Sequence, residues 1–272
     1  MVSPLALAAM AAVLVLCVVV PLSAFAWIAT RRNAEGGRRW RGVWRAFWAG
    51  ALAFTVSQLL TRIPLMTVVI PTLGPDVSGF LLSAPVASYS AGLFEETGRL
   101  VIMLLLMKAF HRWIDGVTFG FGHGGIEAVL LVGMTMLNNL LIALIINAGQ
   151  WETVAAALPE AAATQVFNAL TTTDAAIFLL GGVERLSAIS LHVACSVLIL
   201  AGIVHGRKMT TWLVAVLLHG SFNMVAILGV SGGWPILVVE IMLAAIAVAL
   251  WFGIAKARAW FTQPDAFAPA QK

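Results

Sequence analysis

The chain has 272 residues, of which 61% are hydrophobic and only 10% are charged, and its formal net charge is +4. An ordinary soluble domain carries about a quarter charged residues, so this composition excludes one. Several apolar runs reach the roughly 20 residues that a helix needs to cross a bilayer. A net charge this small does not indicate a nucleic-acid partner. The sequence therefore predicts an all-α, polytopic bundle of membrane helices, with the lipid bilayer as its surroundings.

The first apolar run and the two cysteines further restrict the class of membrane protein. Residues 5–26 are apolar and end in Ser-Ala-Phe-Ala, which resembles a signal-peptide cleavage site. No positive charge precedes the run and a basic cluster follows it, the reverse of a signal peptide, so residues 1–30 are predicted to be an uncleaved first span. Cys17 and Cys195 both lie in apolar runs, which excludes a disulfide framework and a CxxC zinc site.

Seven spans are predicted in chain order. A Pro- and Gly-containing stretch at 64–79 indicates an external loop or a re-entrant segment, and residues 150–174 indicate an external segment with a surface-lying amphipathic helix. Whether the external segment 148–180 acts as a gate is left open. The predicted spans are about 4–30, 43–61, 80–107, 117–146, 182–204, 211–228 and 234–255.

The distribution of basic residues predicts the orientation. Because the chain crosses the bilayer at every span, every second connecting segment lies on the same side of the membrane. All of the 16 Lys and Arg residues except Arg62, Arg99 and Arg185 belong to the segments of one side. Basic loops are typically cytoplasmic, so the N-terminus is predicted outside and the C-terminus inside, with residues 257–272 as a cytoplasmic tail. The chain is interpreted as a single domain, 1–272, with a motif-bearing core at about 62–228, in a bacterial plasma membrane.

The third span holds the most unusual stretch of the sequence. Glu95, Glu96 and Arg99 interrupt a run that is otherwise apolar from residue 81 to 107. Ionised groups at membrane depth are unfavourable and usually mark a functional site. The spacing of Glu95 and Arg99 is i,i+4 with the acid first, which favours an ion pair between them.

Three other spans carry polar groups at a similar depth. His123 and Glu127, then His192, then His219 and Asn223 occur on successive spans, and two of these groups again share an i,i+4 face. At 1.5 Å per residue these groups and Glu95 lie roughly 10–20 Å from the predicted cytoplasmic ends. Each alone could be a structural ion pair or an interhelical hydrogen bond. Their recurrence in one layer predicts a common site, and the glycine-rich run 119–125 predicts close helix packing around it.

The motifs resemble those of a family of membrane proteases. EETGR at 95–99, FGFGH at 119–123 and HGSFN at 219–223 are similar to the motif series of the CPBP (CAAX protease and bacteriocin-processing) and PrsW-like intramembrane proteases. The addition of Glu184-Arg185 and His192 resembles the YhfC branch, usually labelled intramembrane metalloproteases. The first motif departs from the broader EExxxR pattern by one residue.

The resemblance implies an intramembrane endopeptidase that acts on a membrane-embedded protein or peptide. Glu95, with Glu96 as the alternate, would activate water as a general base, because burial and neighbouring charges tune such groups. His123 would position the water, with Glu127 fixing its tautomer, and His219 and Asn223 would stabilise the oxyanion. The predicted catalytic residues are Glu95, Glu96, His123, His192, His219 and Asn223, supported by Arg99 and Glu127.

Neither the cofactor nor the function class is decided by these residues. His123, His192 and His219 could hold a divalent metal such as zinc, but no HExxH motif is present, and a metal-free glutamate mechanism is equally compatible. A proton-coupled transporter also places Glu and His in its spans, although no inverted repeat is visible. A haem-binding membrane protein and a non-catalytic immunity or scaffold protein are compatible with the same polar residues.

Overall fold

The computed structural model describes residues 1–30 and 42–261, and within these ranges all regular structure is helical. The basic loop at 31–41 and most of the predicted tail lie outside the described residues. The helices in chain order are α1 (Pro4–Thr30), α2 (Val43–Phe54), η1 (Thr55–Arg62), η2 (Leu65–Val69), η3 (Ile70–Leu73), α3 (Pro75–Leu81), α4 (Ala84–Leu106), α5 (Trp113–Glu127), η4 (Ala128–Gly133), α6 (Met134–Asn147), α7 (Trp151–Ala155), α8 (Glu160–Thr172), α9 (Ala175–Val204), α10 (Lys208–Ser231), α11 (Ile236–Ala257) and η5 (Arg258–Trp260).

The helices confirm a polytopic membrane protein. Six of those described are long and apolar enough to cross a bilayer. The pair α3 and α4, bent by 61° at its break, is a seventh span if it is counted as one. The first predicted span coincides with α1, whereas the fifth begins at Ala175 rather than at residue 182. The predicted orientation of the two termini stays a prediction.

The predicted loop at 64–79 is wrong over its first part, because the second span continues as helix from Val43 to Leu73. Proline lacks an N–H, and its ring crowds the carbonyl four residues earlier in an α-helix. Here Pro64 lies between two π-helical stretches, η1 and η2, whose wider turns give the ring room. The break in the chain comes later, at Gly74, where φ is +87°. The predicted external segment at 150–174 contains the helices α7 and α8.

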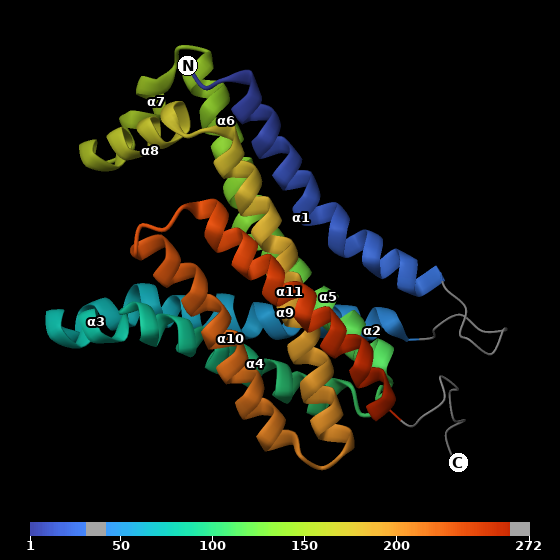
Figure 1. The fold of residues 1–272 in the computed structure, drawn as a ribbon. Coiled ribbons are helices and arrows are strands. Elements are labelled where there is room, and N and C mark those ends of the chain that lie inside the picture. Colours follow the sequence, from blue (N-terminus) through green and yellow to red (C-terminus); the bar gives the residue numbers. More distant parts are fainter. Residues whose placement is uncertain (31–41, 262–272) are drawn as a thin grey trace. The chain divides into compact units, whose positions relative to one another are not determined.

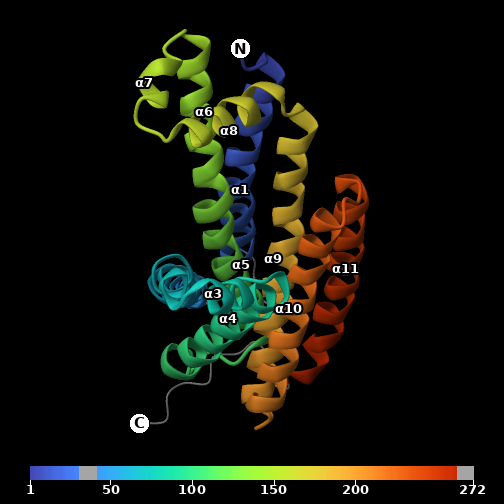
Figure 2. The ribbon, with the colours of Figure 1, turned by 90° about the vertical axis from the view of Figure 1, so that its left-hand side faces the viewer.

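The chain divides into two compact units, residues 1–20 with 127–186 and residues 21–126 with 187–272. The first unit contains α6, α7 and α8 with the beginnings of α1 and α9, and its core includes Met10, Ala143 and Leu170. Figure 2 shows α7 and α8 as short helices beside the end of α6. The interpretation of the chain as a single domain stays a prediction.

The second unit contains all of the helices that carry the EETGR, FGFGH and HGSFN motifs. In it α10 packs along α4 (Figure 1), and α2, α5, α11 and the second half of α9 complete the bundle. Phe119, Leu191, Leu200 and Phe222 belong to its buried apolar core. This core surrounds the polar layer that the sequence predicts.

The glycines of α5 hold that helix close to two neighbours. A Cβ added at Gly120 would lie 2.4 Å from the Cα of Val193 on α9, and one at Gly122 would lie 1.9 Å from the carbonyl oxygen of Phe47 on α2. Both are backbone contacts that cannot relax by a side-chain rotation. The predicted close packing is confirmed. It places His123, the residue after Gly122, against α9.

We expect Gly120→Ala to destabilise the protein by about 1–3 kcal/mol, because the added methyl group must push α5 away from α9. Gly181→Ala is the matched control, since a Cβ there meets nothing within 4 Å and alanine favours a helix. Thermal unfolding of both variants in detergent measures the difference. Equal melting temperatures for the two variants would contradict the described packing.

Candidate active site

Four helices of the second unit bring ionisable side chains to one place. α4 contributes Glu95 and Glu96, and α5, α9 and α10 contribute one histidine each. Every one of these side chains is at most 4% exposed. The ring centroids of His123 and His192 are 4.7 Å apart, and those of His192 and His219 are 5.2 Å apart. The predicted common layer is therefore a contiguous cluster.

Glu95 lies at the centre of this cluster. Its Oε2 is 3.0 Å from Nε2 of His123 and 3.9 Å from Nδ1 of His192. Its Oε1 is 3.8 Å from Nε2 of His219. One carboxylate is thus within 4 Å of all three imidazoles, an arrangement suited to sharing a proton, a water or a metal ion among them.

Glu96 has a different set of partners. Nε of Arg99 donates to its Oε2 at 2.7 Å and Nη2 donates to its Oε1 at 3.2 Å. The same Oε1 is 2.8 Å from Nδ1 of His219. The sequence spacing favours Glu95 as the partner of Arg99, and this expectation is wrong: the structure pairs Arg99 with Glu96, at i,i+3.

The other hydrogen bonds of Arg99 explain why it pairs with Glu96 rather than with Glu95. Its Nη1 donates to the carbonyl oxygen of His192 at 3.1 Å and to the hydroxyl of Ser196, and its Nη2 also donates to Nδ1 of His192 at 3.0 Å. With the two bonds to Glu96, all five N–H groups of the buried guanidinium have acceptors. These bonds to α9 draw the side chain toward Glu96 and join α4 firmly to α9.

The bond to Glu96 also decides which nitrogen of His219 carries the hydrogen. Because a carboxylate paired with arginine only accepts, Nδ1 of His219 donates to Glu96. In the neutral ring, Nε2 then keeps a lone pair, and this atom faces Glu95. A carboxylate that orients a histidine in this way is the usual outer partner of a metal-binding imidazole.

The two remaining predicted residues lie apart from the cluster's hydrogen bonds. Asn223 is half-buried on α10, one helical turn beyond His219, and its amide bonds to no described side chain. Glu127 belongs to the first unit, where its Oε1 accepts from Arg185 at 3.0 Å and Arg185 also bonds to Glu184. Nδ1 of His123 has no hydrogen-bond partner among the described residues. The predicted role of Glu127 in fixing the tautomer of His123 is therefore not supported.

Sequence reasoning missed Gln58 and Arg62. Gln58 lies in the π-helix η1, and its Nε2 donates to Oε1 of Glu95 at 2.5 Å. Nη1 of Arg62 donates to Oε1 of Gln58 at 3.3 Å, while Nη2 donates to the carbonyl of Ala87 on α4 at 2.6 Å. Because arginine only donates, it fixes the amide with its NH₂ toward Glu95. The sequence did contain a signal for this pair. Gln58 is a lone amide in an apolar span, and Arg62, four residues later, is a basic residue outside the predicted cytoplasmic segments.

The donor set of the cluster fits a divalent metal ion. Glu95, His123 and His192 each offer a ligand atom within 4.8 Å of the others, and Glu96, His192 and His219 form a second such group. Neutral imidazoles and a carboxylate are zinc ligands, and two ligands at zinc distances in a tetrahedron are about 3.4 Å apart. The 3.0 Å between Oε2 of Glu95 and Nε2 of His123 is close to this separation, and His192 would bind through Nε2, because its Nδ1 accepts from Arg99.

The chain is similar to a known family and to a curated membrane protein. Residues 16–246 match the family described as YhfC intramembrane metalloprotease. The chain is 37% identical over 173 residues to "Uncharacterized membrane protein YhfC" of Bacillus subtilis (strain 168), an alignment that covers 63% of this chain and 67% of that protein. No solved structure matches the chain. The matched region contains every residue of the cluster, and the chain belongs to the YhfC intramembrane metalloprotease family.

Proposed function

We propose that this protein is an intramembrane endopeptidase, in a bacterial plasma membrane, that hydrolyses peptide bonds of membrane-associated proteins or peptides. The observation that carries the proposal is a buried carboxylate within 4 Å of three imidazoles, with a second carboxylate held behind it by arginine. Hydrolysis needs a general base beside the attacking water. The cluster supplies one among buried side chains.

Glu95 is the proposed general base, and Glu96 is an orienting residue. Glu96 is fully buried and accepts three hydrogen bonds, two from Arg99 and one from His219, which suits it to act as counter-ion and orienting group. Glu95 faces His123 and His192 with Oε2, while Gln58 holds its Oε1. The two adjacent glutamates therefore have separate tasks.

The oxyanion of the tetrahedral intermediate requires a donor, and Asn223 is the proposed one. In its neutral form, His219 presents a lone pair rather than an N–H toward Glu95, because its Nδ1 hydrogen is donated to Glu96. It is therefore suited to accept a hydrogen bond or to bind a metal. Asn223 lies on the same face of α10 and can donate from its NH₂ group.

His123, His192 and His219 would hold a divalent metal ion such as zinc. A metal bound by these residues supplies Lewis-acid polarisation of a carbonyl group and of water. The protein's own contribution is positional: Glu96 fixes the tautomer of His219, and Arg99 fixes the ring of His192. Such outer partners typically contribute about 10- to 100-fold in metal affinity or activity.

The test is a comparison of new protein termini in membranes from cells that express the wild type or Glu95→Gln. Termini that lie within or beside predicted spans and require Glu95 identify the substrates. Glu184→Gln is the matched control, because this carboxylate pairs with Arg185 outside the cluster and should leave cleavage intact. If identical termini accumulate with wild type and Glu95→Gln, the proposed activity is excluded.

The contact between Gln58 and Glu95 predicts a kinetic effect. Gln58→Ala is expected to lower kcat by about 10- to 100-fold with little change in KM, because Glu95 loses the donor that fixes its carboxylate plane. Ser57→Ala is the control, since its hydroxyl bonds to the carbonyl of Ala53 in its own helix at 2.8 Å. A change confined to KM, or an equal loss in Ser57→Ala, would show that Gln58 does not position the base.

A further inference from the structure

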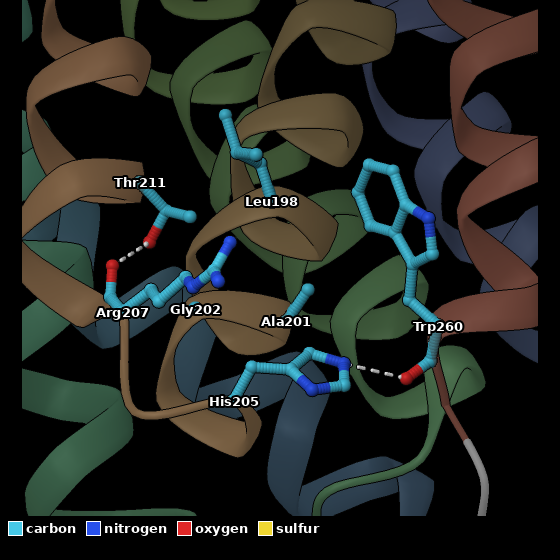
Figure 3. A pocket seen from close by; sticks show the side chains of 7 residues that line it. All are labelled: Leu198, Ala201, Gly202, His205, Arg207, Thr211 and Trp260. Carbon is cyan, nitrogen blue, oxygen red and sulfur yellow. Dashed lines mark hydrogen bonds between the residues drawn. The ribbon is translucent and has the colours of Figure 1, made fainter.

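Two adjacent cavities lie in the second unit, near the end of α9 and the start of α10. The larger, of about 490 Å³, is lined by His205, Arg207, Thr211 and Trp260 beside small and apolar residues of α9 (Figure 3). The smaller, of about 150 Å³, lies between α9, α10 and α11. Both are lined by Leu198 and Trp260, so they are adjacent, and neither contains a residue of the Glu and His cluster.

The larger cavity is basic. Figure 3 shows the guanidinium of Arg207 on the opposite side of the cavity from the indole of Trp260, with His205 between them below. The Arg207 side chain forms no hydrogen bond or ion pair with a described residue. His205 bonds through Nε2 to the carbonyl oxygen of Trp260 at 2.8 Å, which joins the end of α9 to the segment after α11. Among the described residues that line this cavity, the cation available to a ligand is therefore Arg207.

The start of α10 adds to the positive charge. Arg207 is the N-cap and Lys208 the first residue of this 24-residue helix, whose first turn has no acidic residue and no side-chain cap. A helix N-terminus is already electropositive and favours anions over cations. Two basic residues at this end, beside a cavity, leave a local excess of positive charge that a bound anion would neutralise.

The smaller cavity is apolar throughout. Its walls include Leu218 of α10, Leu250 and Gly253 of α11, and Leu198 of α9. A Cβ added at Gly253 would meet nothing within 4 Å, so the groove is open at this point. From Trp260 to Leu250 the chain rises about 15 Å along the bundle, the direction in which a lipid tail would extend from an interfacial headgroup.

We propose that these two adjacent cavities together bind one anionic phospholipid, with its phosphate at Arg207 and the start of α10 and one acyl chain in the groove of Leu198, Leu218, Leu250 and Gly253. A free anion would use only the basic half, and a neutral lipid would leave Arg207 uncompensated. Basic pockets between membrane helices are suited to anionic headgroups, and tryptophan favours the membrane interface. This site goes beyond the proposed peptidase activity and does not depend on it.

The experiment counts phosphatidylglycerol and phosphatidylcholine molecules retained by the purified protein in native mass spectrometry, over a lipid titration. We expect one phosphatidylglycerol to be retained in preference to phosphatidylcholine. Arg207→Ala should weaken its binding about tenfold, the value of one charge-assisted hydrogen bond. Gly253→Leu, which fills the groove without touching the basic half, should weaken it as well.

Two matched controls keep the test specific. Lys256→Ala removes an exposed charge near the end of α11 that does not line either cavity, and Gly181→Leu adds a leucine where a Cβ meets nothing. Both should retain the lipid. Equal retention of the two lipids, equal loss in Lys256→Ala and Arg207→Ala, or full retention in Gly253→Leu would overturn the proposal. Displacement of the lipid by inorganic phosphate alone would reassign the site to a free anion.

Discussion

Glu95→Gln is expected to lower the rate of peptide-bond cleavage by about a thousandfold or more while the protein stays folded. Glutamine has nearly the same shape, and its amide oxygen can still accept from Gln58 while its NH₂ can donate to His123. What it lacks is a carboxylate that can take a proton from water. The measurements are the cleavage rate of an identified substrate in reconstituted vesicles and the melting temperature of the same preparation.

The variant Glu96→Gln is a control that should differ from Glu95→Gln in stability. Glu96→Gln leaves the buried guanidinium of Arg99 without its counter-ion, so this variant should lose stability as well as activity. A variant of Glu95 that unfolds, together with a stable and active variant of Glu96, would reverse the proposed roles. Equal activity of wild type and Glu95→Gln would remove the carboxylate from the mechanism.

Arg99→Leu is expected to destabilise the protein by about 3–5 kcal/mol, because Glu96 would remain charged and buried without a cation. The substitution also breaks three bonds to α9. Replacing both members of a buried pair with apolar residues is often tolerated. The double variant Arg99→Leu with Glu96→Leu should therefore recover much of the stability, but not the activity, since His219 loses its orienting carboxylate.

Unfolding in a mild detergent, followed by tryptophan fluorescence, measures both variants. Asp115→Asn is the comparison, because Asp115 pairs with Arg112 at the start of α5, two turns before His123, and forms no hydrogen bond with the cluster among the described contacts. That variant should lose stability but retain activity per folded molecule. A double variant less stable than Arg99→Leu alone would contradict the account of Arg99 as the counter-ion of Glu96.

The sequence predicted the helices and the meeting of four spans, because both depend on where apolar runs begin and end. Apolar runs fix where membrane helices occur, and matched depth placed Glu95, His123, His192 and His219 in one layer. The position of Pro64 led to a wrong end for the second span. Helix-breaking residues are tolerated within membranes when the backbone adjusts locally, and here the π-helical turns made that adjustment.

The finer contacts depend on tertiary packing that spacing cannot resolve. Both glutamates are within one turn of Arg99, and the choice of Glu96 follows from the bonds that Arg99 makes to α9. Gln58 is an isolated amide whose importance emerges only when η1 packs against α4. Glu127 shares a helix face with His123 in sequence, but its hydrogen bond goes to Arg185.

The most direct test of the central claim is the cleavage rate of the purified, reconstituted protein before chelation, after chelation and after zinc is added back, with the bound metal measured in each sample. The account predicts about one metal per wild-type chain, loss of cleavage with loss of metal, recovery with zinc, and no cleavage by Glu95→Gln in any state. Full cleavage by exhaustively chelated, metal-free protein would contradict the metal site, and cleavage by Glu95→Gln would contradict the catalytic cluster itself.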